Sequence, residues 1–335
     1  MQPYHPVRPY TSALSVRETQ RAIKRVKDAF QVRLAAALRL DRVTAPIIVE
    51  AGRGINDDLN GTERKVSFTL GATGQAVEIV QSLAKWKRMQ LGFFGYAPGE
   101  GIYTDMNAIR RDDAVDHLHS VFVDQWDWEK VITRADRTLE YLEGVARTIV
   151  ATLADVKETV TELYPALSRP VGREVFCLTT ADLERRYPTL SRKEREDAIT
   201  REYGTVFLEQ IGVPLSDGKP HDGRAPDYDD WALNGDLLVW NDVLGGALEL
   251  SSMGIRVDET SLARQLAAAG ADDRRELEYH RVVLSGAYPL TVGGGIGQSR
   301  LCMYLLEKAH IGEVQSSVWP VDTREELARE NIYLL

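Results

Sequence analysis

The most informative stretch of this chain reads Gly293-Gly294-Gly295-Ile296-Gly297-Gln298-Ser299-Arg300-Leu301-Cys302-Met303. Glycines at alternate positions leave the backbone of a strand bare, so that a flat ring can lie against it. Arg300 follows the last glycine by three residues and opens an apolar run, which predicts the start of a helix. A fixed positive charge beside the free amides of a helix N-terminus favours an anion. We therefore expect Gly295, Gly297 and Arg300 to contact a nucleotide. The alternative is a glycine-rich turn that serves backbone geometry alone.

The spacing of these residues, GxGxGxxR, differs from the two common nucleotide-binding fingerprints. It is not the dinucleotide pattern GxGxxG, and no Lys-Ser or Lys-Thr pair follows it as in a phosphate-binding loop. It resembles the third signature motif of class II aminoacyl-tRNA synthetases.

Composition places the chain among ordinary globular proteins. It has 335 residues, of which 44% are hydrophobic and 27% charged, enough for a substantial core in one large domain or two small ones. The formal net charge of −9 and the lack of a Lys- or Arg-rich tail argue against a large nucleic-acid interface. Cys177 and Cys302 match neither a metal-ligand nor a disulfide spacing, which favours a reducing compartment.

Targeting and membrane signals are not recognisable in the sequence. The first residues, Met1-Gln2-Pro3-Tyr4-His5-Pro6, lack the apolar core of a signal peptide, and no apolar run approaches the length of a membrane span. We therefore expect a soluble, cytoplasmic protein with no membrane partner.

Two long helices and several groups of strands are expected. A capping-box pattern at residues 15–18 precedes an apolar face with steps of three and four, and a second long helix is predicted over about 136–163. Residues 42–49 predict a strand that carries Pro46, which belongs at an edge or an interface. The other expected strands fall in residues 66–94, 102–104, 119–124, 237–240 and 247–250.

The rest of the chain is less regular. Residues 166–215 form a block with a capping box at 191–194 and a helix stop at Gly204. Two shorter helices are expected after it, one that ends near Gly270 and one over about 273–284. Because strands are grouped rather than alternating with helices, the expected fold is α+β, with a mainly antiparallel sheet flanked by helices. We expect one catalytic domain over residues 1–335.

A second constellation surrounds Arg110. This arginine belongs to a strand-loop-strand unit. The second strand of the unit, within residues 119–129, is rich in polar and aromatic side chains. A lone arginine at a strand end is usually a solvated surface residue, and Arg111 could equally be that residue. The unit resembles the second class II motif, in which a strand arginine grips the α-phosphate of ATP. The helix and strand that end near Pro46 resemble the first motif and its dimer interface. All three signatures thus follow in order.

A pair of carboxylates lies in neighbouring strand-like segments. Asp236 and Glu249 could hold Mg²⁺, which binds through one or two carboxylates together with phosphate oxygens. Two solvated charges at a sheet edge are the alternative. Arg256 follows Glu249 by seven residues, a step that resembles aspartyl- and asparaginyl-tRNA synthetases, where that arginine holds a substrate carboxyl group.

Two further charged clusters complete the pattern. The cationic run at residues 82–88 encloses Trp86, which indicates partial burial, and residues 224–231 gather three carboxylates around aromatic side chains. The second cluster is either a simple acidic turn or a binding site for an ammonium group.

Taken together, these segments resemble the ammonia-dependent asparagine synthetases, or aspartate–ammonia ligases, over nearly the whole chain. The matching segments are residues 56–61, 82–88, 123–129, 224–231, 249–256, 293–303 and 310–320. The resemblance implies a class II synthetase-like core, a homodimer, and a need for ATP and Mg²⁺. Some members carry a longer insert before Asn234, where this chain has only Trp231-Ala232-Leu233.

The resemblance also implies a mechanism. The side-chain carboxylate of L-aspartate attacks the α-phosphorus of ATP to give β-aspartyl-AMP and pyrophosphate, and ammonia then displaces AMP. For ATP, the resemblance implies that Arg110 contacts the α-phosphate, that Arg300 contacts the γ-phosphate, and that His119, Gly295 and Gly297 contact the nucleotide, with Mg²⁺ bound by Asp236 and Glu249.

For aspartate, the resemblance implies that Lys87 and Arg256 bind the α-carboxylate and that Ser82 and Ser252 make further contacts with the substrate. The amino group and ammonia would be oriented by Asp57, Gln125, Asp127 and Asp229.

Three other functions fit the sequence less well. A tRNA-charging synthetase is disfavoured by the negative net charge and by the lack of a segment long enough for an anticodon-binding domain. A catalytically silent paralogue is disfavoured because Arg110, Arg300 and both metal candidates are in place. A glutamine-using amidotransferase is disfavoured because Gln2, not cysteine, follows the initiator methionine, so ammonia is expected to come from solution.

Overall fold

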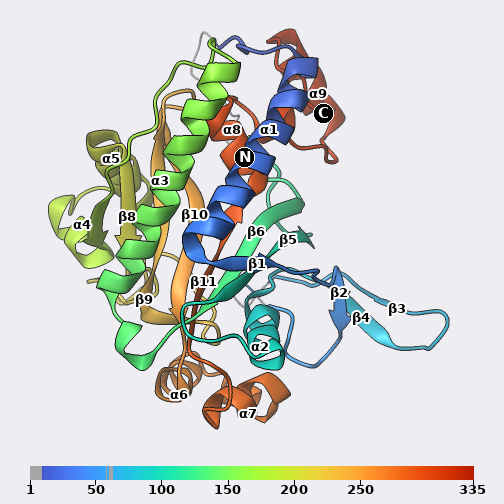
Figure 1. Cartoon of the computed structure of the whole chain (residues 1–335), viewed down its shortest axis with the longest axis vertical. Coiled ribbons are helices and arrows are strands. Elements are labelled where there is room, and N and C mark those ends of the chain that lie inside the picture. Colours follow the sequence, from blue (N-terminus) through green and yellow to red (C-terminus); the bar gives the residue numbers. More distant parts are fainter. Residues whose placement is uncertain (1–9, 58, 60–62) are drawn as a thin grey trace.

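An eight-stranded sheet forms the centre of the protein in the computed structural model, which describes residues 10–57, 59 and 63–335 (Figure 1). Its inner pairs are all antiparallel, and only the two outermost pairs, β1 with β5 and β7 with β8, are parallel. The prediction of a mainly antiparallel sheet is therefore confirmed. In spatial order the strands are β1 (Leu40–Arg42), β5 (Gly101–Ile109), β6 (Phe122–Val131), β11 (Thr291–Gly297), β10 (Gly246–Arg256), β9 (Asp229–Asn241), β8 (Thr205–Glu209) and β7 (Phe176–Thr179).

Long helices cover the sheet, as Figure 1 shows. The main core is formed by apolar side chains of α1 (Val16–Leu38), α3 (Leu139–Leu163) and α8 (Gln298–Leu305) together with those of the central strands. The remaining helices are α2 (Ala84–Phe94), α4 (Thr180–Arg186), α5 (Arg192–Tyr203), α6 (Glu259–Ala268), α7 (Glu278–Leu284), α9 (Val321–Arg329) and the 3₁₀ turns Arg134–Asp136, Asp272–Glu276 and Ile311–Glu313.

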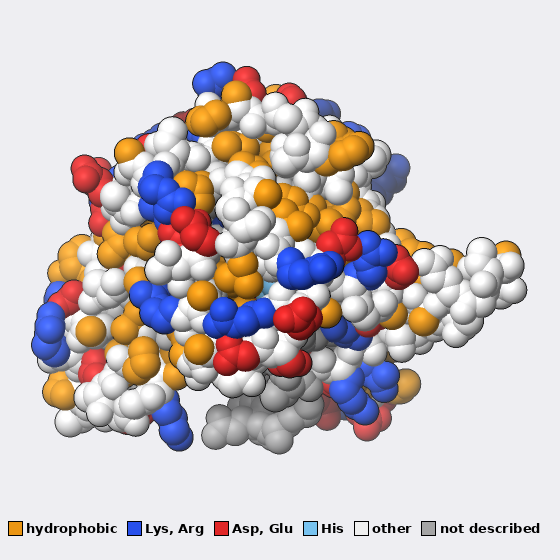
Figure 2. Space-filling model, turned by 90° about the horizontal axis from the view of Figure 1, so that it is seen from below, with side chains coloured by type: hydrophobic (Ala, Val, Ile, Leu, Met, Phe, Trp, Pro, Cys, Tyr) orange, Lys and Arg blue, Asp and Glu red, His pale blue; other side chains and the backbone are white. Residues whose placement is uncertain are grey.

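A small second sheet projects from the side of the protein. It contains β2 (Ile48–Glu50), β4 (Ala76–Ile79) and β3 (Ser67–Thr69), all antiparallel, and its β3–β4 hairpin forms the protruding arm of Figures 1 and 2. On the face drawn in Figure 2, basic and acidic side chains are interspersed rather than gathered into one basic patch.

Local sequence signals set the helix boundaries. The Ser15 hydroxyl accepts a hydrogen bond from the Glu18 amide at 3.3 Å, and the Glu18 carboxylate accepts one from the Ser15 amide at 2.9 Å. The same reciprocal box starts α5 at Ser191, and α5 ends at Gly204 with a φ of +78°. These predictions are confirmed, as is the long helix that ends at Leu163.

Three local predictions were wrong in detail. The expected strand over 42–49 is broken, because β1 ends at Arg42 and β2 begins at Ile48 in the other sheet, with Pro46 and its missing amide between them. Residues 84–94 form a helix rather than strands. His119 precedes β6, which begins at Phe122.

Among the helices in the described ranges, none is long and apolar enough to cross a bilayer. The stretch from Met1 to Pro6 and residues 58, 60 and 61 of the matching segment 56–61 lie outside the described residues.

Candidate active site

A cavity of about 520 Å³ lies over β6, β11 and β10 and collects most of the residues singled out from the sequence. Lys87 and Asp236 do not line it, but each contacts a residue that does, since Lys87 pairs with Asp127 and Asp236 with Arg224. The predicted residues that line the cavity are Asp57, Ser82, Arg110, His119, Gln125, Asp127, Asp229, Glu249, Ser252, Arg256, Gly295, Gly297 and Arg300.

The glycines of β11 make room for charged and polar side chains from the neighbouring strands. A Cβ atom on Gly293 would lie 2.0 Å from Oε2 of Glu129 and 2.6 Å from Nη2 of Arg256. A Cβ atom on Gly295 would lie 2.3 Å from Oε1 of Gln125. Since real Cβ contacts are never this short, the polar side chains of the cavity wall depend on glycine at both positions.

Two arginines on different elements line the cavity and make few contacts with other protein groups. Arg110 directly follows β5, and its Nη2 and Nε atoms lie 3.3 and 3.4 Å from the Gln81 carbonyl oxygen. Arg300 sits in the first turn of α8, where Nη1 donates to the Glu249 carbonyl at 3.2 Å and lies 3.6 Å from its carboxylate. Both side chains are only partly buried. The arrangement offers two fixed positive charges to an anion such as a polyphosphate.

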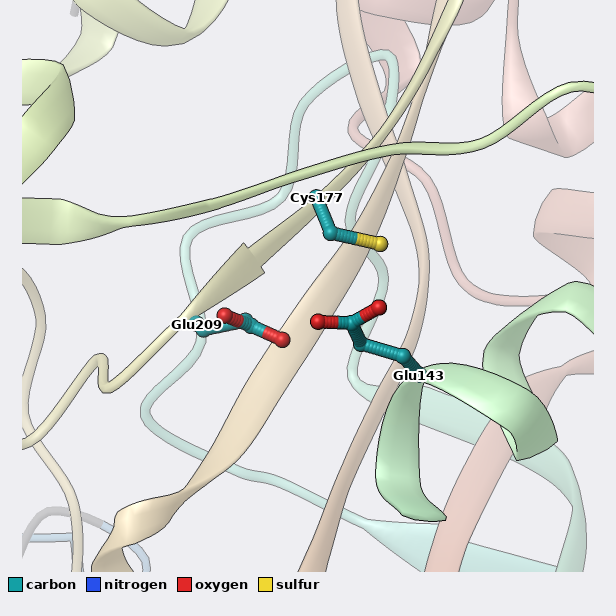
Figure 3. A group of neighbouring side chains, drawn as sticks. All are labelled: Glu143, Cys177 and Glu209. Carbon is teal, nitrogen blue, oxygen red and sulfur yellow. The ribbon is translucent and has the colours of Figure 1, made fainter. Parts of the chain in front are cut away.

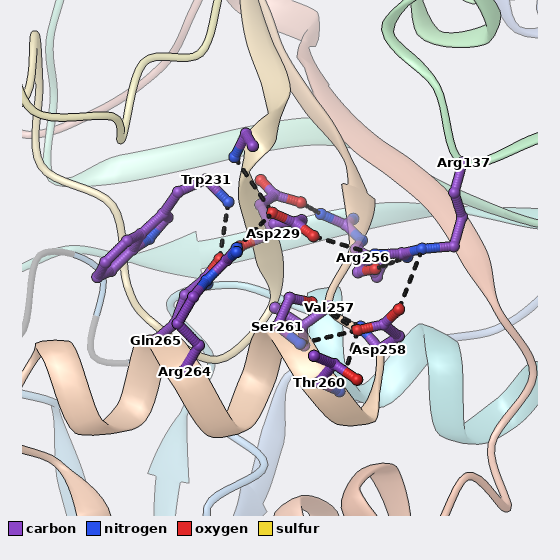
Figure 4. A network of polar contacts seen from close by, with 12 residues as sticks. Arg137, Asp229, Trp231, Arg256, Val257, Asp258, Thr260, Ser261, Arg264 and Gln265 are labelled. Carbon is purple, nitrogen blue, oxygen red and sulfur yellow. Dashed lines mark hydrogen bonds and ion pairs between the residues drawn. The ribbon is translucent and has the colours of Figure 1, made fainter.

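A buried ionic network around Arg256 borders the cavity, and Figure 4 shows Arg256 with Asp229 and their polar neighbours. Arg256 donates to both carboxylate oxygens of Glu129, at 2.8 to 3.1 Å, and also to Asp229. Burial alone would raise the pKa of Glu129, but the charges of Arg256 and Lys87 outweigh it and hold that pKa below its usual value. The network therefore keeps Glu129 ionised and Arg256 fixed in place.

Lys87 lies beneath the cavity on α2 and is completely buried. Its ammonium contacts Asp127 and donates to the Trp128 carbonyl at 2.9 Å. Burial lowers its pKa, although Asp127 and Glu129 oppose the shift. Lys87 therefore acts on the cavity by neutralising Asp127.

The two candidate magnesium ligands differ in accessibility. Glu249 lines the cavity, whereas Asp236 is buried and accepts two hydrogen bonds from Nη2 of Arg224, at 2.6 and 2.5 Å. Burial raises the pKa of Asp236 to about 6, with Glu249 adding to the shift and Arg224 opposing it. Two carboxylates close enough to influence each other, one of them lining the cavity, fit a divalent cation, and Arg224 pairs with Asp236.

Comparison with known proteins shows the family of this chain. A family model described as aspartate-ammonia ligase matches residues 17–331. The chain belongs to the aspartate–ammonia ligase family. It is 54% identical over 325 residues to an aspartate–ammonia ligase of Bacillus cytotoxicus, covering 97% of this chain and 99% of the relative. It is 55% identical over 312 residues to one of Clostridium tetani, covering 93% and 92%.

Solved structures show the fold that this ligase shares with class II synthetases. An asparaginyl-tRNA synthetase of Entamoeba histolytica in complex with asparaginyl-adenylate matches with a TM-score of 0.64 at 17% identity, over 90% of this chain and 66% of that one. The asparaginyl-tRNA synthetase of Pyrococcus horikoshii complexed with asparaginyl-adenylate matches with a TM-score of 0.62 at 15% identity, over 90% and 70%. The predicted class II synthetase-like core is therefore confirmed.

Two residues at or beneath the cavity of the ligase were not predicted from the sequence, the buried Glu129 and the cavity-lining Arg224. Glu129 follows Gln125 and Asp127 at a spacing of two on β6, and this alternation places all three on one face, a signal that could have identified it. Arg224 opens the acidic segment 224–231, but its contact with Asp236 depends on the approach of that segment to β9. No pattern in the sequence indicates this contact.

Proposed function

We propose that this ligase makes asparagine from L-aspartate, ammonia and ATP through β-aspartyl-AMP, releasing AMP and pyrophosphate. One observation supports this above all: two partly buried arginines and several carboxylates line the same cavity, in a member of the aspartate–ammonia ligase family. The arginines suit a polyphosphate, and the carboxylates suit an amine and a metal ion.

In the first step, a β-carboxylate oxygen of aspartate attacks the α-phosphorus of ATP, and pyrophosphate leaves. Arg110 would stabilise the charge on the α-phosphate and Arg300 that on the γ-phosphate. His119, Gly295 and Gly297 line the same cavity and would border the nucleotide. This step needs charge neutralisation rather than a protein nucleophile, because the acyl adenylate is itself reactive. Mg²⁺ held by Glu249 and Asp236 would add to that neutralisation.

Recognition of aspartate would rest on the buried network. Arg256 would bind the α-carboxylate with the edge of its guanidinium that faces the cavity, and Lys87 would assist through Asp127. Ser82 and Ser252 line the same cavity and offer hydroxyl groups to the substrate. This orientation leaves the β-carboxylate of aspartate toward ATP.

In the second step, the ammonia nitrogen attacks the acyl carbon and AMP leaves. Ammonium predominates at neutral pH, so a neighbouring group must take a proton before or during attack. Asp57, Gln125, Asp127 and Asp229 would orient the substrate amino group and receive ammonia, and a carboxylate among them is the proton acceptor.

We further propose that the chain works as one catalytic unit and as a homodimer in the cytoplasm. The largest hydrophobic cluster joins residues from Leu14 to Trp319, which supports a single unit. Cys177 and Cys302 are free thiols, which suits a reducing compartment. Strand β1 pairs only with β5 among the described residues, so its outer edge is open to a second copy.

The decisive experiment follows the fate of ATP. Purified protein with ATP, Mg²⁺ and aspartate is assayed for AMP, pyrophosphate and asparagine, with and without ammonium. We expect AMP and asparagine in equal amounts, both dependent on ammonium. Formation of ADP and phosphate would contradict the adenylate route, and charging of tRNA in place of free asparagine would contradict the amide synthesis.

A further inference from the structure

Three side chains from distant parts of the sequence meet outside the active-site cavity (Figure 3). Glu143 lies in α3, Cys177 in β7 and Glu209 at the end of β8. One potential ligand atom from each lies within 4.8 Å of those from the other two. None of the three lines the cavity of the proposed active site, so the cluster needs its own explanation.

The pairing of the two edge strands places two of these side chains together. Cys177 lies opposite Phe207 in the parallel pair of β7 and β8, and Glu209 follows Phe207 by two residues on the same face. Helix α3 covers this edge and brings Glu143 above them, and Figure 3 shows the three functional groups pointing toward one another. The geometry is thus fixed by strand register and helix packing.

One carboxylate oxygen of Glu209 is buried without a partner. Its side chain is only 4% exposed, and its Oε1 atom is buried without a hydrogen-bond partner. Burial, the negative charge of Glu143 and a hydrogen bond with the Glu143 side chain raise the pKa of Glu209 to about 7. A buried carboxylate aimed at a second carboxylate and a thiol is stabilised by a shared cation.

Arg147 supplies only part of the positive charge that would balance these two carboxylates. It lies one helical turn after Glu143, donates to its carboxylate at 2.7 Å and lies 3.5 Å from Sγ of Cys177. Its side chain is 51% exposed, so it can turn toward solvent when another cation enters. Because Arg147 donates to Glu143, Oε1 of Glu209 still has no hydrogen-bond partner.

We propose that Glu143, Cys177 and Glu209 bind a Zn²⁺ ion at a site separate from the active site. Zinc accepts thiolate and carboxylate ligands together in a tetrahedral shell, with bonds of about 2.3 Å to sulfur and about 2.0–2.2 Å to oxygen. Magnesium and calcium prefer oxygen alone, so the cysteine selects the softer ion. Three protein ligands leave a fourth position for water.

Metal binding changes the protonation of the cysteine. Burial, together with Glu143, raises the pKa of Cys177 to about 12, so the site holds a thiol before the ion enters. Coordination deprotonates a thiol, and the proton goes to solvent. The bound ion would tie the first turns of α3 to the β7–β8 edge of the sheet and so raise the unfolding temperature.

Cobalt titration of the chelator-treated full-length protein tests the proposal. A Co²⁺–thiolate bond gives a near-ultraviolet charge-transfer band, which carboxylates of the active site cannot produce. We expect one equivalent of Co²⁺ to generate the band, Zn²⁺ to abolish it by competition, and Cys177→Ser to eliminate it. Cys302→Ala, which removes the other cysteine, is the matched control and should retain the band.

A second variant distinguishes a metal site with three protein ligands from metal binding by Cys177 alone. Glu209→Gln keeps the shape of the side chain and should weaken Co²⁺ binding at least tenfold, with circular dichroism confirming that the protein is folded. The wild-type unfolding temperature should rise with Zn²⁺, and that of Cys177→Ser should not. No band in the wild type, a band that survives Cys177→Ser, or unchanged affinity in Glu209→Gln overturns the proposal.

Discussion

Arg256 and Glu129 form a buried, two-point ion pair that crosses over strand β11. Arg256 ends β10 and Glu129 lies on β6, the two strands on either side of β11. Their side chains meet above Gly293, which is paired with Glu129 in the sheet, and any Cβ there would clash with both. Glycine at this position is therefore a condition for the arginine to occupy its place at the floor of the cavity.

Replacing Arg256 by lysine should impair recognition of aspartate rather than of ATP. Lysine keeps the charge but loses the planar fork that pairs with Glu129 and with a substrate carboxylate. Loss of one charge-assisted hydrogen bond of roughly 1.5–3 kcal/mol corresponds to a rise of about tenfold or more in the KM for aspartate. Steady-state kinetics with each substrate varied in turn would measure this, with little change expected in the KM for ATP.

The exposed Arg264 offers a control for that experiment. Arg264 pairs with Asp230 at the edge of the same network but does not line the cavity, so Arg264→Lys should leave both KM values nearly unchanged. Gly293→Ala should reproduce the aspartate defect, because it displaces the ion pair. Weakened ATP binding with normal aspartate binding in Arg256→Lys would show that Arg256 does not bind the α-carboxylate of aspartate. Lys87 would then be the remaining candidate for that role.

Arg300 tests the role of the glycine-rich strand and the helix that follows it. Arg300→Ala removes a partly exposed side chain whose hydrogen bond and ion pair are with Glu249, so the fold should persist. If the guanidinium binds the γ-phosphate, kcat/KM for ATP should fall by about tenfold or more, from a loss of roughly 1.5–3 kcal/mol. Unchanged catalytic efficiency for ATP, with an unchanged unfolding temperature, would mean that the stretch has only a structural role.

The features that the sequence predicts well are those encoded locally. The helix that buries Val26, Phe30 and Leu34 repeats apolar residues every three or four positions after a capping box, and both signals act within one segment. The glycine-rich strand and Arg300 are likewise neighbours in the chain. Local signals of this kind identify elements, and they indicate chemistry wherever one segment contains all the groups required.

The features that the sequence predicts poorly depend on partners from distant segments. The sequence predicts strands in residues 66–94 and only partial burial of the cationic run at 82–88. Instead, helix α2 buries Lys85 and Lys87, because Asp227 and Asp127 neutralise them in the folded protein. Its buried face therefore lacks the apolar pattern by which helices are recognised. The cluster around Cys177 is a further case, since its ligand candidates come from three separate elements.

Exposed apolar side chains on α1 and after β1 lead to a prediction about assembly. Val32 is 65% exposed and Ile47 is 59% exposed, both in the helix-strand unit expected to form a homodimer. A charge placed in such an interface would be desolvated without a partner, so Val32→Glu with Ile47→Glu should yield a monomer. Light scattering at several concentrations would measure the mass.

The end of α3 provides a comparison for the dimer variants. Leu163 is 53% exposed but lies outside the helix-strand unit, so Leu163→Glu should leave the dimer intact. A wild-type protein that is monomeric and active at all concentrations would defeat the dimer prediction, as would a double variant that keeps the wild-type mass.

His310 should make the stability of the protein sensitive to mild acid. Its ring is 2% exposed, its Nδ1 accepts a hydrogen bond from the Gly312 amide at 3.0 Å, and its plane lies edge-on to Trp319. Burial, with a contribution from His117, lowers the pKa of His310 from 6.5 to about 4. In the folded protein the ring thus stays neutral at pH values where the unfolded chain is protonated.

The sign of the effect follows from which state binds more protons. Between about pH 6.5 and 4 the unfolded state binds the extra proton, so the free energy of unfolding falls as the pH falls, by on the order of 3 kcal/mol in total. His310→Asn keeps a hydrogen-bond acceptor for Gly312 but cannot titrate. Urea unfolding of both proteins from pH 7.5 to 4.5 should therefore show a shallower loss of stability in the variant. Parallel curves for the two proteins would mean that His310 is protonated equally in both states and contributes nothing to acid sensitivity.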